Sequence, residues 1–201
     1  MSAEAKHKSG ATRRWLLQAG AALLICVLGL ATASVQADSY DDRRVRTGAR
    51  LVRALLAADE DASGRAKASG QLAVQVYAGA NASVDAIIPL IAPMGDAGPT
   101  KVRGLPVRVT RAQRLPPDSE PLPTVVFLAV PLDSAEFSEL LAWCIANGVV
   151  LYSPFEGDVE RGATAGLSVQ AKVQPFLNLA TLEASRIKLR PFFLDHSRVW
   201  R

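Results

Sequence analysis

The chain has few of the residues that build metal centres and disulfide frameworks. Its 201 residues include two Cys, at positions 26 and 144, and two His, at positions 7 and 196. A structural zinc site takes four Cys or His ligands, and a disulfide scaffold takes several paired Cys. The sequence therefore excludes a zinc ribbon, a His-rich metal site and a disulfide-knotted fold, and we expect no metal ligands.

The sequence also lacks the short motifs of nucleotide chemistry and hydrolysis. No Gly-x-Gly-x-x-Gly follows a predicted strand, and there is no Gly-x-Ser-x-Gly or His-Glu-x-x-His. Residues 157–162 have the glycine spacing of a phosphate-binding loop, but Ala163 stands where that motif needs Lys. Without this Lys, no side chain neutralises the β- and γ-phosphates. We expect a non-enzymatic protein with no catalytic residue and no cofactor.

The N-terminal segment has the pattern of a secretory signal peptide. An uncharged run of 23 residues, 15–37, follows four basic residues and ends with Val35 and Ala37 at the −3 and −1 positions of a cleavage site. We predict cleavage after Ala37 and a location of the folded part outside the cytoplasm. The run is also long enough for an uncleaved inner-membrane anchor. Residues 12–17 resemble a twin-arginine signal. Two questions are therefore left open: whether the segment is cleaved or kept as an anchor, and whether export uses the general secretory or the twin-arginine route.

Most of the basic charge belongs to this segment. The whole chain has a formal net charge of +4, and residues 1–37 hold four basic residues and one acidic residue. Residues 38–201 are left with a net charge near +1. Nucleic-acid binding needs a basic patch on the folded domain, so we expect no nucleic-acid partner.

Residues 38–201 have the pattern of one α/β domain. The apolar run 124–130 is typical of a strand buried on both faces, and a helix at 135–146 followed by a strand at 149–152 completes a βαβ unit. We predict a single three-layer domain with a mixed, largely parallel central sheet flanked by helices. Further helices are predicted at 39–58, 81–91 (capped by Ser83), 182–186 (capped by Thr181) and 192–200. Further strands are predicted at 72–77 and 105–110, two short strands within 166–179, and a loop at 59–70.

Cys144 lies at the apolar end of the helix predicted at 135–146. The first interpretation is a small buried apolar residue. A catalytic thiolate with His196 as its base is the alternative, but nothing around Cys144 matches a nucleophile signature.

Two charged segments are candidate partner-binding surfaces. Five Arg occupy the polar side of the first predicted helix, at positions 43, 44, 46, 50 and 53, and basic helices suit acidic partners. The loop after residue 152 is dense in charge, and loops are where binding residues concentrate. An ordinary solvated face is the alternative in both cases. The predicted contact residues are Arg43, Arg46, Arg50, Arg53, Glu156, Asp158, Glu160 and Arg161.

Three segments of the C-terminal part, residues 151–166, 173–179 and 187–194, resemble the YfiR-like family of small exported bacterial proteins. The resemblance implies a non-enzymatic periplasmic repressor. It would bind the periplasmic part of an inner-membrane signalling receptor, a diguanylate cyclase or a kinase type, and so control cyclic di-GMP and biofilm. A homodimer is left open. Residues 57–62 depart from the family's Trp-Pro turn, and the single Cys of residues 38–201 permits no internal disulfide.

A small-molecule-binding module is the alternative function. In open α/β sheets, ligands bind beyond the carboxyl ends of the strands. That rim would include Pro131, Ser153 and the loop that follows it.

Overall fold

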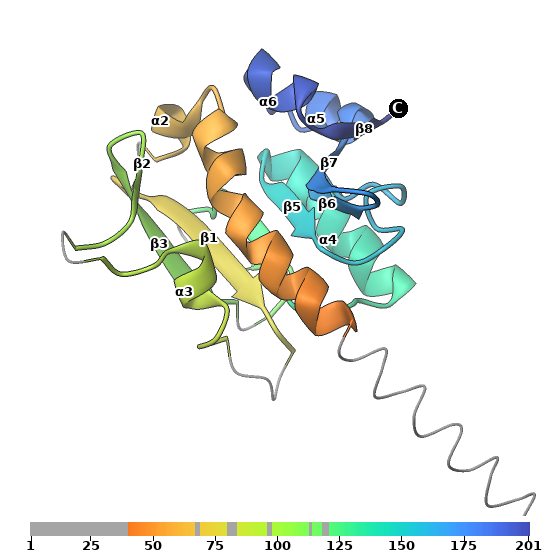
Figure 1. Cartoon of the computed structure of the whole chain (residues 1–201), viewed down its shortest axis with the longest axis horizontal. Coiled ribbons are helices and arrows are strands. Elements are labelled where there is room, and N and C mark those ends of the chain that lie inside the picture. The colour runs from red at the N-terminus through yellow and green to blue at the C-terminus, as the bar shows by residue number, and fades with distance from the viewer. Residues whose placement is uncertain (1–39, 67–68, 80–83, 96–97, 113, 118–120) are drawn as a thin grey trace, which may run out of the picture. The chain divides into compact units, whose positions relative to one another are not determined.

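An eight-stranded sheet forms the centre of the described chain (Figure 1). The computed structural model describes residues 40–201 except 67–68, 80–83, 96–97, 113 and 118–120. It divides into Met1–Asp42 and a second unit, Arg43–Arg201, to which the following description applies. The predicted signal peptide, with Cys26, and the predicted cap Ser83 lie outside the described residues. None of the helices in the described ranges is both long and apolar enough to cross a membrane.

The sheet is mostly parallel, as predicted. Its order is β2-β3-β1-β4-β5-β6-β7-β8, and only the β2–β3 and β6–β7 pairs are antiparallel. The strands are β1 (Leu72–Tyr77), β2 (Lys101–Val102), β3 (Leu105–Arg111), β4 (Val125–Leu128), β5 (Val150–Ser153), β6 (Ala165–Val169), β7 (Val173–Asn178) and β8 (Arg198–Trp200).

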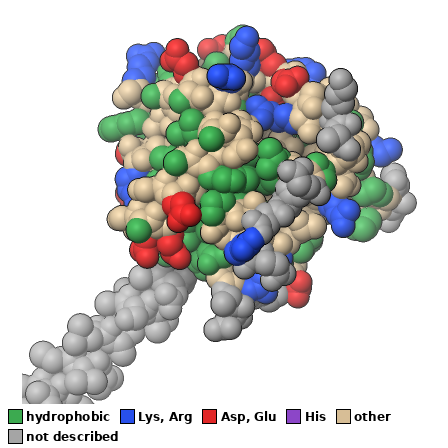
Figure 2. Space-filling model, turned by 180° about the vertical axis from the view of Figure 1, so that it is seen from behind, with side chains coloured by type: hydrophobic (Ala, Val, Ile, Leu, Met, Phe, Trp, Pro, Cys, Tyr) green, Lys and Arg blue, Asp and Glu red, His purple; other side chains and the backbone are tan. Residues whose placement is uncertain are grey.

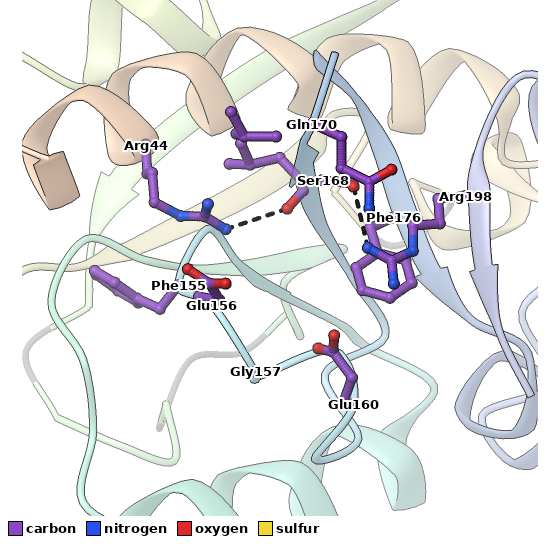
Figure 3. Close-up of a pocket in the computed structure, with 11 residues that line it drawn as sticks. Arg44, Phe155, Glu156, Gly157, Glu160, Ser168, Gln170, Phe176 and Arg198 are labelled. Carbon is purple, nitrogen blue, oxygen red and sulfur yellow. Dashed lines mark hydrogen bonds between the residues drawn. The ribbon is translucent and has the colours of Figure 1, made fainter. Parts of the chain in front are cut away.

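Helices lie on both faces of this sheet, which confirms the three-layer α/β prediction. The first, which we call the N-terminal helix, covers residues 40–58. It crosses one face, and α4 lies on the other (Figures 1 and 3). The remaining helices are short. The labelled helices are α2 (Ala62–Arg65), α3 (Ile88–Ile91), α4 (Ser134–Asn147), α5 (Leu179–Ala184) and α6 (Pro191–Asp195).

Strands β4 and β5 form a fully buried part of the core beneath the N-terminal helix. All four residues of each strand are buried. Phe127 and Tyr152 are partners in register, and their rings stack with centroids 5.3 Å apart. A Cβ atom at Gly48 would lie 3.1 Å from the Tyr152 ring. Glycine at this position therefore lets the helix backbone approach the sheet closely.

Local sequence sets both ends of α4. The Asp133 carboxylate accepts hydrogen bonds from the backbone N–H groups of Ala135 and Glu136. Gly148 ends the helix in the left-handed region, at φ 63°. Cys144 is fully buried, and this burial raises the pKa of its thiol. His196, the base of the alternative thiolate interpretation, is exposed, whereas Cys144 is buried. The interpretation of Cys144 as a buried apolar residue is therefore confirmed.

Several element predictions are wrong. The predicted loop 59–70 contains α2. In the helix predicted at 81–91, residues 85–87 form turns and only Ile88–Ile91 are helical. Asn178, rather than Thr181, caps α5, because its side chain accepts from the Thr181 backbone N–H. β2 was not predicted.

The C-terminal prediction is wrong for a different reason. Instead of one helix at 192–200, α6 ends at Asp195 and β8 follows, with Trp200 41% exposed. Strand β8 pairs with β7 in parallel and satisfies backbone groups that would otherwise be left open on that strand. A tertiary pairing thus overrides the local apolar spacing.

The order in which the chain adds strands to the sheet reverses between β1 and β4. After β1 it passes to β3 on one side, and after β4 it passes to β5 on the other. Numbered along the chain, the five parallel strands have the order 2-1-3-4-5 of flavodoxin-like sheets, whose ligands bind at the carboxyl ends at this switch point. This topology predicts where a ligand site lies.

Candidate functional site

Two hollows open near the carboxyl ends of the parallel strands. The first, which we call the helix–loop cleft, has a volume of about 110 Å³. The second, the switch-point crevice, has a volume of about 270 Å³ and lies beside the ends of β1 and β3. The side chains that carry the chemistry of the helix–loop cleft are Arg44, Phe155, Glu156, Glu160, Phe176 and Arg198 (Figure 3).

Arg44 ties the N-terminal helix to the loop after β5. Its Nε atom donates to the Pro154 carbonyl at 2.7 Å, and Nη2 donates to the Leu167 carbonyl at 3.2 Å. The residue is only 6% exposed, so its assignment to the polar side of the helix is wrong. Arg44 lies one turn before Gly48, on the side that faces the sheet. This spacing is the signal that the sequence analysis missed.

The hydroxyl of Tyr152 is buried beneath this region. Burial raises its pKa, and the charge of Arg44 offsets part of that shift. The Tyr152 hydroxyl is therefore neutral. The Arg44 guanidinium donates its hydrogen bonds to the carbonyl groups of Pro154 and Leu167.

Asp158 is a structural residue of the loop and not an exposed contact. Ser153 Oγ donates to Asp158 Oδ2 at 2.5 Å, and Arg161 Nη1 lies 3.1 Å from Oδ1. Burial raises the pKa of Asp158, and these two partners lower it in part. Ser153 is fully buried as well. The predictions of Asp158 as a contact residue and of Ser153 as part of an open rim are therefore corrected.

Arg161 points toward α4. Its guanidinium lies 4.3 Å from the centroid of the Phe137 ring, in a cation–π contact, while it also pairs with Asp158. The predicted acidic residues Glu156 and Glu160, by contrast, both line the helix–loop cleft. The structure thus divides the predicted loop residues into an anchoring pair, Asp158 and Arg161, and a pair at the cleft.

The opposite wall of the cleft comes from β7 and β8. The Arg198 guanidinium lies 4.4 Å from the centroid of the Phe176 ring, and Nη1 donates to Ser168 Oγ at 3.3 Å. Figure 3 shows Glu156 on the Arg44 side of the cleft and Glu160 nearer Phe176 and Arg198. Sequence reasoning missed Arg198 because it placed this segment in a helix.

The other predicted Arg residues form a stripe along the N-terminal helix. Arg43, Arg46 and Arg50 are exposed and Arg53 is half-buried. Their spacing of three and four residues places them on one side of the helix. We call these four residues the Arg stripe. None of them lines the cleft, so the structure supports a basic helix surface that is separate from the cleft itself.

The switch-point crevice is built from three segments. Tyr77 ends β1, residues 114–116 follow β3, and Glu136 and Glu139 belong to α4. Tyr77, Glu136 and Glu139 are not among the site residues predicted from the sequence. A signal was present, because Tyr77 ends a predicted strand and both Glu lie in the helix after the predicted central strand.

The helix–loop cleft has the composition of a recognition surface. In the described ranges, no three His, Cys, Asp or Glu side chains are grouped to hold a metal ion. The helix–loop cleft offers charges of both signs beside aromatic rings, which is typical of surfaces that recognise a partner. Comparison of the chain with models of known protein families and with curated proteins gives no match, so the YfiR-like resemblance stays a prediction.

Proposed function

We propose that this protein is a non-enzymatic periplasmic regulator that binds a protein partner through the helix–loop cleft and the Arg stripe. The partner class is an inner-membrane signalling receptor, of which a diguanylate cyclase is the first candidate. In that role the protein represses cyclic di-GMP synthesis and biofilm formation. The pattern of the N-terminal segment and the C-terminal resemblance to YfiR-like proteins support this proposal.

The observation that carries the proposal is the charge arrangement of the cleft. Arg44 and Arg198 are held by hydrogen bonds to neighbouring groups, whereas no described residue forms an ion pair or a hydrogen bond with the carboxylate of Glu156 or Glu160. Open charges at a surface steer association and select the partner. Two carboxylates at a cleft therefore suit a partner segment that brings basic side chains.

The cleft is also well organised before any partner arrives. Arg44 joins the N-terminal helix to the carbonyl groups of Pro154 and Leu167. Asn178 Nδ2 donates to the Val159 carbonyl at 2.8 Å and fixes the far side of the loop. A binding surface that is already ordered loses less conformational entropy when it binds. These contacts hold Glu156 and Glu160 at defined positions.

Charge reversal tests this function. The variant Glu156→Lys/Glu160→Lys is expected to lose co-purification with the receptor and to raise cellular cyclic di-GMP. The variant Arg43→Glu/Arg46→Glu tests the Arg stripe in the same way. Glu183→Lys, at an exposed position of α5, is the matched control. If both double variants, at wild-type protein level, keep receptor binding and wild-type cyclic di-GMP, the assignment of these surfaces is wrong.

A small-molecule-binding module is the second candidate function. It is favoured by the switch-point crevice, which lies where open α/β sheets bind their ligands. Thermal unfolding in the presence of a metabolite panel measures it directly. A melting temperature that no metabolite raises would exclude this second function.

A further inference from the structure

The switch-point crevice has an acidic wall. Among the described residues that line it, Glu136 and Glu139 are acidic and Arg114 is basic, so this part of the lining has a negative formal charge. Viewed from behind Figure 1, acidic side chains gather at the lower left of the surface, next to hydrophobic ones (Figure 2). A ligand that enters the crevice therefore meets negative charge and apolar surface together.

The two carboxylates lie one helical turn apart on α4. Residues three positions apart share a side of a helix, and both Glu are exposed. Among the residues that the structure describes, none forms an ion pair or a hydrogen bond with either carboxylate. Glu136 lies in the first turn, where the helix dipole favours an acid, but Glu139 lies beyond that turn. The helix dipole therefore does not explain why the residue at position 139 is acidic.

The helix that carries these carboxylates is firmly placed. Asp133 caps its first turn, and Phe137 and Leu140, which alternate with the two Glu, are buried in the core. The Cα positions of Glu136 and Glu139 are thus fixed by packing, so a ligand finds the pair already spaced.

Apolar surface in the crevice comes from the end of β1 and from the segment after β3. Tyr77, Leu115 and Pro116 are each half-buried, so each leaves part of its surface open to the crevice. The face of an aromatic ring also attracts cations. At about 270 Å³, the crevice lies just below the roughly 300–1,000 Å³ of drug-sized sites, which limits the ligand to a small molecule.

We propose that the switch-point crevice binds a small organic ammonium ligand with an apolar body. The ammonium group lies between the carboxylates of Glu136 and Glu139, and the body packs against Tyr77, Leu115 and Pro116. This inference rests on the second candidate function, small-molecule binding. It is independent of the partner surface at the helix–loop cleft.

A charge series with one carbon skeleton tests the ligand class. The probes are 2-phenylethylamine, a cation; 2-phenylethanol, its neutral counterpart; and phenylacetate, an anion. Binding to the purified protein, expressed from the full chain, is measured by calorimetric titration and by ligand-observed NMR. Only the amine is expected to bind, and its affinity is expected to fall with added salt because the attraction is electrostatic.

Variants then locate the site. Glu136→Gln and Glu139→Gln are each expected to weaken amine binding about fivefold, and the double variant about twentyfold, the range expected for exposed ion pairs. Glu183→Gln on α5 is the matched control and should bind as the wild type does. Both crevice residues are exposed, so the melting temperatures should match the wild type, which separates loss of binding from loss of folding.

Each contrary outcome overturns a defined part of the proposal. Equal binding of amine and alcohol, or preferred binding of phenylacetate, would overturn the ammonium class. Undiminished binding by the double variant would overturn the site. A protein that binds none of the three probes but is stabilised by another metabolite would overturn the ligand class while the small-molecule function survives. Stabilisation by no metabolite at all would remove that function as well.

Discussion

Replacing Arg44 with Ala is expected to destabilise the fold and release the loop after β5. Arg44 donates to two backbone carbonyl groups, those of Pro154 and Leu167, and the residue is buried. A hydrogen bond to a charged group contributes about 1.5–3 kcal/mol, and loss of the donor leaves a buried acceptor unsatisfied. Removing a buried charge recovers part of its desolvation cost. We therefore expect the free energy of unfolding to fall by about 3 kcal/mol.

The assay is urea unfolding followed by circular dichroism, with amide hydrogen exchange to report on residues 155–157. Arg50→Ala is the matched control, because Arg50 is exposed on the same helix, and it should change the unfolding free energy by less than about 0.5 kcal/mol. Arg44→Lys should fall between the two, since an ammonium group does not reproduce the planar fork of the guanidinium. If Arg44→Ala proves as mild as Arg50→Ala, Arg44 does not hold the cleft together.

Three further predictions concern the core and the loop. Gly166→Ala should lower the free energy of unfolding in urea by several kcal/mol, because a Cβ atom there would lie 2.3 Å from the Ser153 carbonyl oxygen. Gly95→Ala, in open space, should be nearly neutral. Equal effects of the two changes would contradict the close approach of β6 to Ser153. Cys144 should react with iodoacetamide only after unfolding, measured by mass spectrometry with Cys26 replaced by Ser; labelling of the native protein would show that the thiol is accessible. Burial raises the pKa of Asp158, so ionising this carboxyl costs the folded state stability. The unfolding free energy of the wild type, measured relative to Asp158→Asn, should therefore fall as the pH rises from about 4 to 7. A rise over that range would show that the pKa is lowered instead.

The sequence predicted those elements whose signals are local. The run 124–130 and the capped helix after it give β4, α4 and β5, because Asp133, the apolar side of the helix and Gly148 all agree with the final packing. Alternating apolar residues likewise predict strands at 166–179, where β6 and β7 lie, and the structure pairs the two as an antiparallel hairpin. Where local preference and tertiary packing agree, the pattern alone is sufficient.

The failures come from contacts between distant residues. Apolar spacing at 192–200 suggests a helix, but β7 needs a neighbour and β8 provides it. Arg44 and Asp158 both appear as ordinary charged residues in a sequence, and only the fold shows that their partners lie in buried places. Of the predicted contact set, Glu156 and Glu160 line the cleft, while Arg198 from β8 completes a wall that no local pattern indicates.

Photocrosslinking in living cells of the protein's own species tests most directly whether the helix–loop cleft binds an inner-membrane receptor. The change Glu160→p-benzoylphenylalanine puts the crosslinker at the cleft, and Glu183→p-benzoylphenylalanine puts it at an exposed position of α5. We predict that position 160, and not position 183, captures an inner-membrane protein with a cyclase or kinase output domain. Exported protein that gives no adduct at position 160, or the same adducts at both positions, would contradict the proposal.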